Sequence, residues 1–311
     1  MTENPAGPRY VYSDDYYCDI GEHVFRTEKY GLLHAKLIEE GIVQPDEFLE
    51  PEPASRRDLE LVHTTEYLND LLAFRHTPRT LRSEMPISRG IVEAFILGAG
   101  GTMLACRTAL QEQCFAMNLA GGFHHAFPDW AEGFCYINDV AGGVARVRAD
   151  ELARKVAVVD CDLHQGNGTA YIFRNEPDVF TFSIHQENNY PLKRQSDLDI
   201  GLPDLCDAAA YLRELESNLR RVLDDFEPEF VLYVAGADPY RHDVLGGLLL
   251  EIEDLKRRDE IVLGACAERG IPAAATLAGG YAPDVSETVR IHYGTAITME
   301  ELSRDGGGDD G

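Results

Sequence analysis

The chain has 311 residues, and its 54 acidic residues outnumber the 28 Lys and Arg residues, giving a formal net charge of −26. This balance argues against a duplex nucleic-acid partner, because there is no surplus of basic side chains to displace counterions. It suits a cationic substrate, or simply a well-solvated acidic surface. The length is compatible with one large α/β domain.

Cysteine usage and the N-terminal sequence bear on location. The chain has seven cysteines, an odd number without a CxxC pair, which is typical of reduced thiols in a cytosol. The N-terminus lacks the basic and apolar regions of a signal peptide. The longest uncharged apolar stretch, residues 94–106, is too short and glycine-rich to cross a bilayer. We therefore expect a cytoplasmic protein that does not act at a membrane.

Strand-length apolar runs alternate with helical patterns over most of the chain. Two N-terminal helices are predicted at 26–41, ended by Gly41, and at 64–74, opened by a threonine cap. Buried strands are predicted at 114–119, 155–160, 178–184, 229–236 and 271–279. Further helices are predicted at 91–110, 136–150, 207–226, 248–269 and 284–298. Such alternation indicates a parallel sheet with helices on both faces.

The two ends of the chain look different from the rest. Residues 1–8 are polar with two prolines, and residues 301–311 are rich in Gly and Asp. Neither composition can bury much apolar surface. We predict one domain over residues 9–300, with a flexible N-terminus at 1–8 and a flexible acidic tail at 301–311.

Chemically reactive side chains follow four of the predicted strands. In parallel α/β sheets, ligands bind beyond the carboxyl ends of the strands. The residues found at these positions are His124, His125, Asp160, Asp162, His164, Asp238 and Tyr281. Each has an ordinary interpretation alone, as a helix cap, a chance histidine pair or a tight glycine turn. Their coincidence at four strand ends favours a functional site.

The segment DCDLH at 160–164 is the most specific of these signals. In an extended chain, residues two apart point to one face, so two carboxylates and an imidazole converge. A divalent cation relieves that crowding, and Asp238 can complete a set with Asp162 and His164. Such a set without sulfur resembles an open catalytic zinc site, and Fe²⁺ is a credible substitute. Asp160 is left to orient a histidine, to cap backbone or to bind a monovalent cation, and Cys161 should face away.

Taken in order, the motifs GGFHH, GFCYIND, DCDLH, GAD and GGY give the chain a clear family resemblance. It resembles the zinc-dependent histone deacetylase family, which includes acetylpolyamine amidohydrolases and acetoin-utilisation proteins and shares its fold with arginases. The similarity runs from about residue 8 to residue 298 and is greatest to class IV deacetylases and their bacterial relatives. It implies a single domain with a central eight-stranded parallel sheet, helices on both faces and a narrow tunnel leading to the metal.

The resemblance also implies roles for individual residues. The metal ligands would be Asp162, His164 and Asp238, and the catalytic residues would be His124, His125, Tyr281, Asp160 and Asn167. Among these, Asp160 would hold His124, Asn167 would face His125, and Tyr281 would donate its hydroxyl to the oxyanion. The substrate tunnel would be formed by Gly133, Phe134, Tyr190 and Leu245. A structural K⁺ site would be formed by Asp160, Asp162, His164, Ser183 and Ile184.

Two positions depart from a common family pattern. Gln165 stands where a second histidine often follows the ligand histidine, and Asn167 stands where an aspartate often faces the second catalytic histidine. An amide stabilises an imidazolium less than a carboxylate does. We therefore expect His125 to have a lower pKa than it would beside an aspartate.

The function implied is hydrolysis of N-acyl-lysine, carrying an acetyl or longer acyl group, by metal-activated water. The histidines would serve as base and acid and Tyr281 as oxyanion donor. The substrate would be acylated lysine in a protein or peptide, or else an acetylated polyamine or other small amide. A non-catalytic acyl-lysine binding protein is a further alternative. An arginase-like two-metal hydrolase is disfavoured, because Asp238 is followed by Pro239 and Tyr240 rather than by another carboxylate. The oligomeric state is left open.

Overall fold

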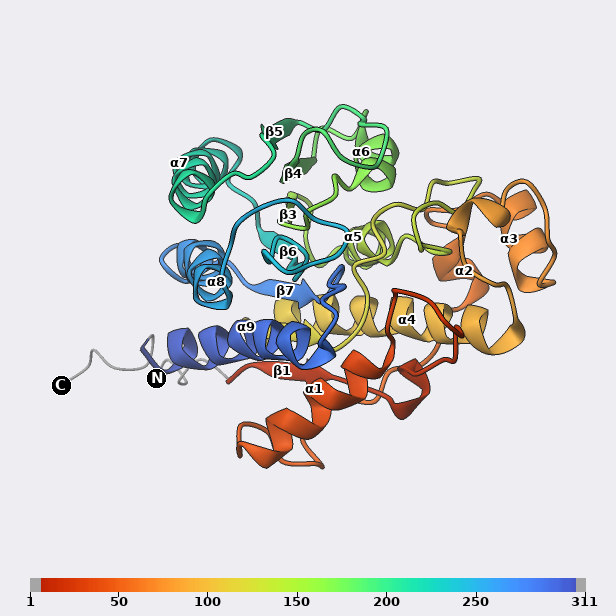
Figure 1. Cartoon of the computed structure of the whole chain (residues 1–311), viewed down its shortest axis with the longest axis horizontal. Coiled ribbons are helices and arrows are strands. Elements are labelled where there is room, and N and C mark those ends of the chain that lie inside the picture. The colour runs from red at the N-terminus through yellow and green to blue at the C-terminus, as the bar shows by residue number, and fades with distance from the viewer. Residues whose placement is uncertain (1–6, 306–311) are drawn as a thin grey trace.

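A central sheet of seven parallel strands organises the computed structural model, which describes residues 7–305 (Figure 1). The strand order is β1-β2-β7-β6-β3-β4-β5. The strands are β1 (Arg9–Val11), β2 (Phe115–Asn118), β3 (Val156–Asp160), β4 (Val179–Gln186), β5 (Leu198–Leu202), β6 (Phe230–Val234) and β7 (Ala273–Thr276). The central strands β2, β3, β6 and β7 are buried along their whole length, as expected of strands covered on both faces.

Helices cover both faces of the sheet (Figure 1). One face packs against α1 (Glu28–Glu39), α7 (Ala208–Phe226), α8 (Ile252–Ala267) and α9 (Val285–Asp305). The other face packs against α4 (Arg89–Glu112), α5 (Asp139–Ala149) and α6 (Asn167–Phe173). Alternate side chains of one strand serve the two cores: Ala157 and Val159 of β3 face the first set, and Val156 and Val158 face the second.

A third hydrophobic cluster lies beyond the sheet, beside the site. It joins α4 to the short helices α2 (Arg56–Leu59) and α3 (Thr65–Leu72) and to the loop before α1. Its buried members include Phe25, Phe95 and Phe123, and Phe134 and Tyr281 pack against it while half-buried. Of the two aromatic residues of the predicted tunnel, Phe134 is therefore supported from behind by a packed layer, and so is the predicted catalytic Tyr281.

The predicted α/β fold with a parallel sheet is confirmed, but the number of strands is not eight. Within residues 7–305 there are seven strands. Beside the edge strand β1, Leu49 makes a single isolated parallel bridge to Val11 and does not extend into a strand. Pro51 and Pro53 follow it closely, and proline has no N–H to donate to a ladder.

The boundaries of the predicted domain also change in part. Helix α9 continues to Asp305, so residues 301–305 are helical rather than part of a flexible tail. The remainder of the predicted tail, residues 306–311, and residues 1–6 of the predicted flexible N-terminus lie outside the described residues.

Helix α4 is the one described segment long and apolar enough to cross a membrane by composition. However, 67% of its most apolar 18 residues are buried inside the protein. Its buried side chains contact β1, β2 and α5, so its apolar character is explained by its central place in the core. All seven cysteines are also buried and unpaired, which agrees with the expectation of free thiols.

Candidate metal centre and active site

Three side chains converge beyond the carboxyl ends of β3 and β6. Asp162 and His164 follow β3, Asp238 follows β6, and their ligand atoms all lie within 4.8 Å of one another. All three residues are buried. No other group of three potential metal ligands converges in this way within residues 7–305. The predicted ligand set is thus brought together by two neighbouring strands.

The backbone fixes the two carboxylates before any metal binds. Asp162 accepts a hydrogen bond from the Gly279 N–H at 2.8 Å, and Asp238 accepts one from the Leu163 N–H at 2.9 Å. Gly279 has to be glycine, because a Cβ there would overlap the carboxylates of Asp162 and Asp238. The GG pair before Tyr281, which alone suggests only a tight turn, is therefore also a packing requirement of the ligand set.

The ligands are arranged around a positive charge. His164 Nδ1 lies 2.9 Å from Asp238 Oδ2 and 3.3 Å from Asp162 Oδ1. Burial opposes protonation of His164, but hydrogen bonds to the two carboxylates and their charges raise its pKa to about 10. A proton on Nδ1 therefore occupies the place of a cation between two carboxylates. One imidazole and two carboxylates without sulfur fit Zn²⁺ or Fe²⁺, which would displace this proton.

The two histidines that follow β2 lie beside these ligands. The His124 and His125 Nε2 atoms are 3.1 Å apart. His124 Nδ1 is 2.7 Å from Asp160 Oδ2, and His125 Nδ1 is 2.9 Å from Asn167 Oδ1. The structure thus pairs each histidine with the partner that the family resemblance implied.

The partners give the two rings different charges. Burial disfavours the charged form of His124, but Asp160 and Asp162 outweigh it and raise the pKa to about 9. Burial, together with the charges of His124 and His164, lowers the pKa of His125 well below its usual value. Burial is the main cause, and the Asn167 hydrogen bond itself raises the pKa of His125, so the predicted effect of Asn167 in place of an aspartate stays a prediction. The two Nε2 atoms thus face each other while the pKa values of the two rings are shifted in opposite directions.

The histidine loop is held by the YIND segment, for which sequence reasoning gave no role. Asn138 caps α5 and donates through Nδ2 to the carbonyls of His124 and Ala126 at 3.1 and 3.0 Å. Asp139 accepts from the Gly122 and Phe123 N–H groups at 3.0 and 2.6 Å. These contacts fix the backbone on both sides of the histidine pair.

A cavity of about 240 Å³ opens above these groups. Its lining includes His125, His164 and Tyr281 together with the four predicted tunnel residues, Gly133, Phe134, Tyr190 and Leu245. The Tyr190 ring lies edge-on to His125 at 5.5 Å, and the Phe134 ring lies edge-on to Tyr281 at 5.9 Å. Gly133 passes so close to His125 and Tyr190 that a Cβ there would lie within 2.9 Å of both. The cavity is therefore narrow and aromatic.

Tyr281 is positioned by Asp243, which sequence reasoning missed. The Asp243 carboxylate accepts from the Tyr281 and Leu245 N–H groups at 2.6 and 2.9 Å. Burial and the charge of Asp238 raise the pKa of Asp243 to about 7. Burial likewise raises the pKa of Tyr281 well above its usual value, so its hydroxyl keeps its proton. Asp243 has no sequence signal beyond its nearness to Asp238.

Gln165 contacts the edge strand β5, and Ser183 and Ile184 of the predicted K⁺ site lie in β4. Gln165 Nε2 is 2.6 Å from Asp199 Oδ1 and its Oε1 accepts from Arg194 N–H at 2.7 Å, so it joins β5 to the segment before it. Ser183 pairs with Asp160 across β3 and β4, and Ile184 follows it in β4. The Ser183 hydroxyl is 2.9 Å from His185 Nδ1. The K⁺ site stays a prediction.

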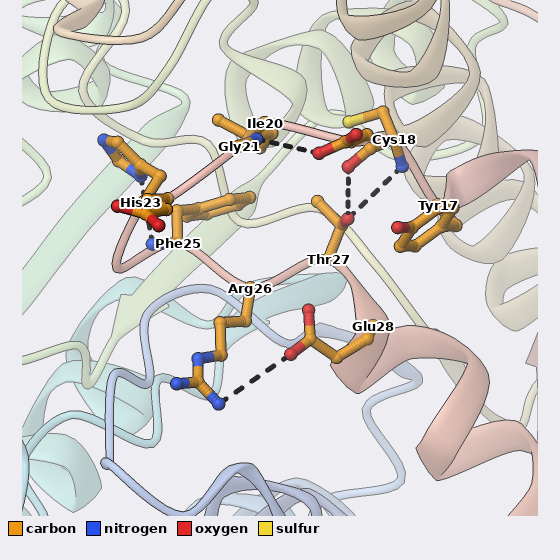
Figure 2. A pocket seen from close by; sticks show the side chains of 11 residues that line it. Tyr17, Cys18, Ile20, Gly21, His23, Phe25, Arg26, Thr27 and Glu28 are labelled. Carbon is orange, nitrogen blue, oxygen red and sulfur yellow. Dashed lines mark hydrogen bonds and ion pairs between the residues drawn. The ribbon is translucent and has the colours of Figure 1, made fainter.

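A separate hollow of about 420 Å³ lies in the loop before α1 (Figure 2). Its lining comes from residues 17–28 alone, and Thr27 closes the loop through hydrogen bonds with the backbone of Cys18. Arg26 and Glu28 form an ion pair at 3.8 Å at its edge (Figure 2). The loop also supports the cavity wall, because the His23 ring packs edge-on against Phe134 at 4.8 Å. No cluster of metal ligands lies in it.

Comparison with known proteins identifies the family. The histone deacetylase domain model matches residues 23–296, and the chain therefore belongs to the histone deacetylase family. It is 41% identical to an uncharacterized protein of Picosynechococcus over 91% of this chain and 95% of that one. It is 28% identical to histone deacetylase 2 of Arabidopsis thaliana, covering 91% of this chain and 74% of the relative. It is 30% identical to a histone deacetylase-like amidohydrolase of Pseudomonas aeruginosa, covering 81% and 69%. Membership of this family makes the protein a deacetylase-type amide hydrolase.

Proposed function

We propose that this protein is a metal-dependent amidohydrolase that removes an acetyl or longer acyl group from N-acyl-lysine. The observation that carries the proposal is the convergence of Asp162, His164 and Asp238 below a narrow cavity lined by His125 and Tyr281. The site offers metal ligands, a neutral base and a hydroxyl donor to the same small volume. Those are the groups that hydrolysis of an unactivated amide requires.

The histidine pair moves the proton. Because His125 Nδ1 faces the Asn167 oxygen, the proton sits on Nδ1 and Nε2 keeps its lone pair. His125 Nε2 takes a proton from the attacking water and then delivers it to the departing amine. His124, held by Asp160, keeps a positive charge next to the developing negative charge.

The remaining groups stabilise the oxyanion and hold the substrate. Tyr281 donates its hydroxyl to the carbonyl oxygen as negative charge develops there, worth about 3–4 kcal/mol for one well-aimed donor. Zn²⁺, or Fe²⁺ in its place, would polarise the carbonyl and acidify the water when bound by Asp162, His164 and Asp238. We also propose that a structural K⁺ ion binds near Ser183.

The shape of the cavity favours a linear amide. Phe134 and Tyr190 are aromatic walls suited to the methylene stem of an acylated lysine, and Leu245 lines the same cavity. An acetylated polyamine has a similar stem and stays the second candidate substrate. The net charge of −26 suits either cation and does not separate them.

Two other functions are less well supported. An acyl-lysine binding protein without activity would have no use for both a neutral buried base and a phenol beside the metal ligands. An arginase-like enzyme needs two metals about 3.5–4 Å apart. Within residues 7–305 only one set of three ligands converges.

The direct test is a substrate panel assayed with metal-free and zinc-reconstituted protein. The panel contains acetyl-lysine peptides, longer acyl-lysine peptides and acetylpolyamines. We expect metal-dependent hydrolysis of the peptides. Hydrolysis confined to acetylpolyamines would move the assignment to the second candidate, and metal-dependent binding without hydrolysis would favour the binding protein. Two metals per chain would favour the arginase-like enzyme.

A further inference from the structure

A buried carboxylate outside the proposed catalytic set lies directly behind the His125 partner. Glu132 is 9% exposed and precedes Gly133 in the wall of the cavity. Its Oε1 accepts a hydrogen bond from Asn167 Nδ2 at 2.8 Å. Its Oε2 accepts from Trp130 Nε1 at 2.9 Å and from Arg82 Nη2 at 2.7 Å. Glu132 is thus an acceptor for three donors that meet on it from different segments.

The hydrogen bonds around Asn167 allow only one orientation of its amide. The oxygen, Oδ1, faces His125 Nδ1 at 2.9 Å and also accepts from the Gly168 N–H at 3.0 Å. The nitrogen, Nδ2, faces Glu132. Rotating the amide by half a turn would set its oxygen against the Glu132 carboxylate and its NH₂ against the Gly168 N–H. A carboxylate accepts and cannot donate, so Glu132 excludes the rotated amide.

We propose that Glu132 is a positioning residue that acts through Asn167 to keep the proton of His125 on Nδ1. The lone pair of His125 is then on Nε2, the atom that faces His124 Nε2 at 3.1 Å. This role rests on the proposed amide hydrolysis, in which Nε2 must be free to accept a proton. The relay consists of the His125 imidazole, the Asn167 amide and the Glu132 carboxylate. The negative charge that supports the base is therefore separated from it by the Asn167 side chain.

The proton balance of the step does not involve Glu132 itself. Water gives one proton to His125 Nε2, and the Nδ1–H stays bonded to the Asn167 oxygen. The imidazolium then gives the Nε2 proton to the leaving amine and returns to its starting form. Glu132 gains and loses no proton. It polarises the Asn167 amide so that Oδ1 carries more negative charge next to the imidazolium.

A purely structural role for Glu132 makes a different prediction. The Arg82 guanidinium stacks over the Trp130 ring at 4.8 Å, so Glu132 also ties two surface segments together. If that were its whole role, Arg82→Gln and Glu132→Gln would perturb the protein alike. If Glu132 positions His125, only the variant that changes the acceptor facing Asn167 disturbs the base.

Replacing Glu132 by glutamine reverses one hydrogen-bond polarity. Glutamine has a single oxygen, and Arg82 and Trp130 both require an acceptor on the Oε2 side. Its NH₂ group then faces the Asn167 NH₂ group, and relieving that conflict rotates the Asn167 amide toward the wrong His125 tautomer. We expect E132Q to lower kcat about 10- to 100-fold, a part of the roughly 10²–10⁴ contributed by a positioned base, with KM little changed.

The exchange variant E132Q/N167D supplies the decisive comparison. An aspartate at 167 accepts from His125 Nδ1, from the Gly168 N–H and from the glutamine NH₂, so every donor again meets an acceptor. We expect E132Q/N167D to recover most of the kcat lost in E132Q, although it carries one more substitution. N167D alone places two carboxylates at hydrogen-bond distance, and we expect it to be less stable than the exchange variant.

The experiment combines kcat and KM for the four proteins with ¹⁵N NMR of histidine-labelled full-length chain. The NMR reads the His125 tautomer without substrate, so it does not depend on hydrolysis. Wild type and E132Q/N167D should show the proton on Nδ1, E132Q should lose that signature, and the control R82Q should keep it. An E132Q protein with the wild-type tautomer and kcat would overturn the role of Glu132. So would an E132Q/N167D protein whose kcat is no higher than that of E132Q. If the tautomers follow the expected pattern but wild type hydrolyses no amide, the proposed function fails while the positioning by Glu132 stands.

Discussion

The two histidines of the pair are each held through Nδ1, but by different chemical groups. On the inner side, the Asp160 carboxylate contacts His124 directly, at 2.7 Å. On the outer side, the Asn167 amide stands between His125 and the carboxylate of Glu132. The pKa of His124 is raised to about 9 and that of His125 is lowered well below its usual value.

The difference shows how adjacent residues of one type acquire separate tasks. Both rings are buried, and burial alone would keep both neutral. A carboxylate in direct contact reverses that effect for His124, whereas an amide in contact does not reverse it for His125. The pKa shifts thus favour the charged form of His124 and the neutral form of His125. Proteins can therefore set the charge of a buried histidine by the group that faces its second nitrogen.

The two histidines can act only on a reaction at the metal, so loss of a metal ligand should lower kcat/KM more than any other change. Asp238→Asn removes one of three charged or basic ligands, and we expect kcat/KM to fall by at least about 10³-fold, because metal catalysis supplies several kcal/mol. Metal content and kcat/KM are measured together. Asp178→Asn, which removes a surface ion pair with Arg154, is the matched control and should leave both unchanged. Full activity in Asp238→Asn would show that the three-ligand set is not the reaction centre.

The Tyr281 hydroxyl is the next group to test, because it is proposed to stabilise the oxyanion beside the two histidines. Tyr281→Phe removes the hydroxyl while keeping the ring against Phe134, and we expect a loss of about 10²–10³-fold in kcat with metal retained. Tyr240→Phe is the control, because its hydroxyl bonds Glu287 outside the cavity. An unchanged kcat in Tyr281→Phe would remove the tyrosine from the mechanism.

The direct contact on the inner side should matter more than the relayed contact on the outer side. Asp160→Asn keeps a hydrogen-bond acceptor near His124 but removes the charge that raises its pKa. We expect kcat to fall by about 10- to 100-fold, and by more than in Glu132→Gln. Metal content has to be measured as well, because Asp160 also accepts from the Asp162 N–H at 3.1 Å. A larger loss in Glu132→Gln at equal metal content would reverse the order of importance.

Another buried histidine, His63, has no acid partner, and its replacement should have the smallest effect, on stability rather than on turnover. Its Nδ1 faces the Phe127 carbonyl and its Nε2 accepts from the Asn138 N–H, and burial lowers its pKa to about 4. The unfolded chain takes up this proton below an ordinary pKa of about 6.5. Stability should therefore be lost as the pH falls from about 6.5 to about 4, by up to roughly 3 kcal/mol.

Urea unfolding at pH 7 and pH 5 measures this loss. His63→Gln should be less stable at pH 7 but should lose less between the two pH values than wild type. His76→Gln, at an exposed position, should behave as wild type. Equal pH dependence in wild type and His63→Gln would show that His63 does not carry the effect.

Much of the fold was predictable because the central strands are buried on both faces. Strands β2, β3, β4, β6 and β7 are continuous apolar runs, and each predicted segment contains the strand or most of it. The edge strands β1 and β5 were missed. The first has three residues, and the second, LDIGL, contains a glycine and is mostly exposed or half-buried, so neither carries a strong pattern.

The candidate site was predictable from the residue pattern where it depends on strand ends, and the four loop residues of the cavity were predicted only through the family resemblance. Asp162, His164, Asp238, His124 and His125 follow strands, and the sheet brings them together. Glu132 and Asp243 lie between elements, with no periodicity or spacing to mark them. Their importance follows from which N–H groups face them, and that is decided by tertiary packing. The sequence also offers no sign that Asn138 and Asp139 hold the histidine loop.

The measurement that tests the proposed chemistry most directly is a titration of metal-free protein with Zn²⁺, following bound metal and hydrolysis of an acyl-lysine peptide together. We predict that activity rises in proportion to bound metal and saturates at one ion per chain, and that Asp238→Asn loses both. Hydrolysis that persists in the metal-free protein, or that requires two ions per chain, would contradict a single-metal centre at Asp162, His164 and Asp238.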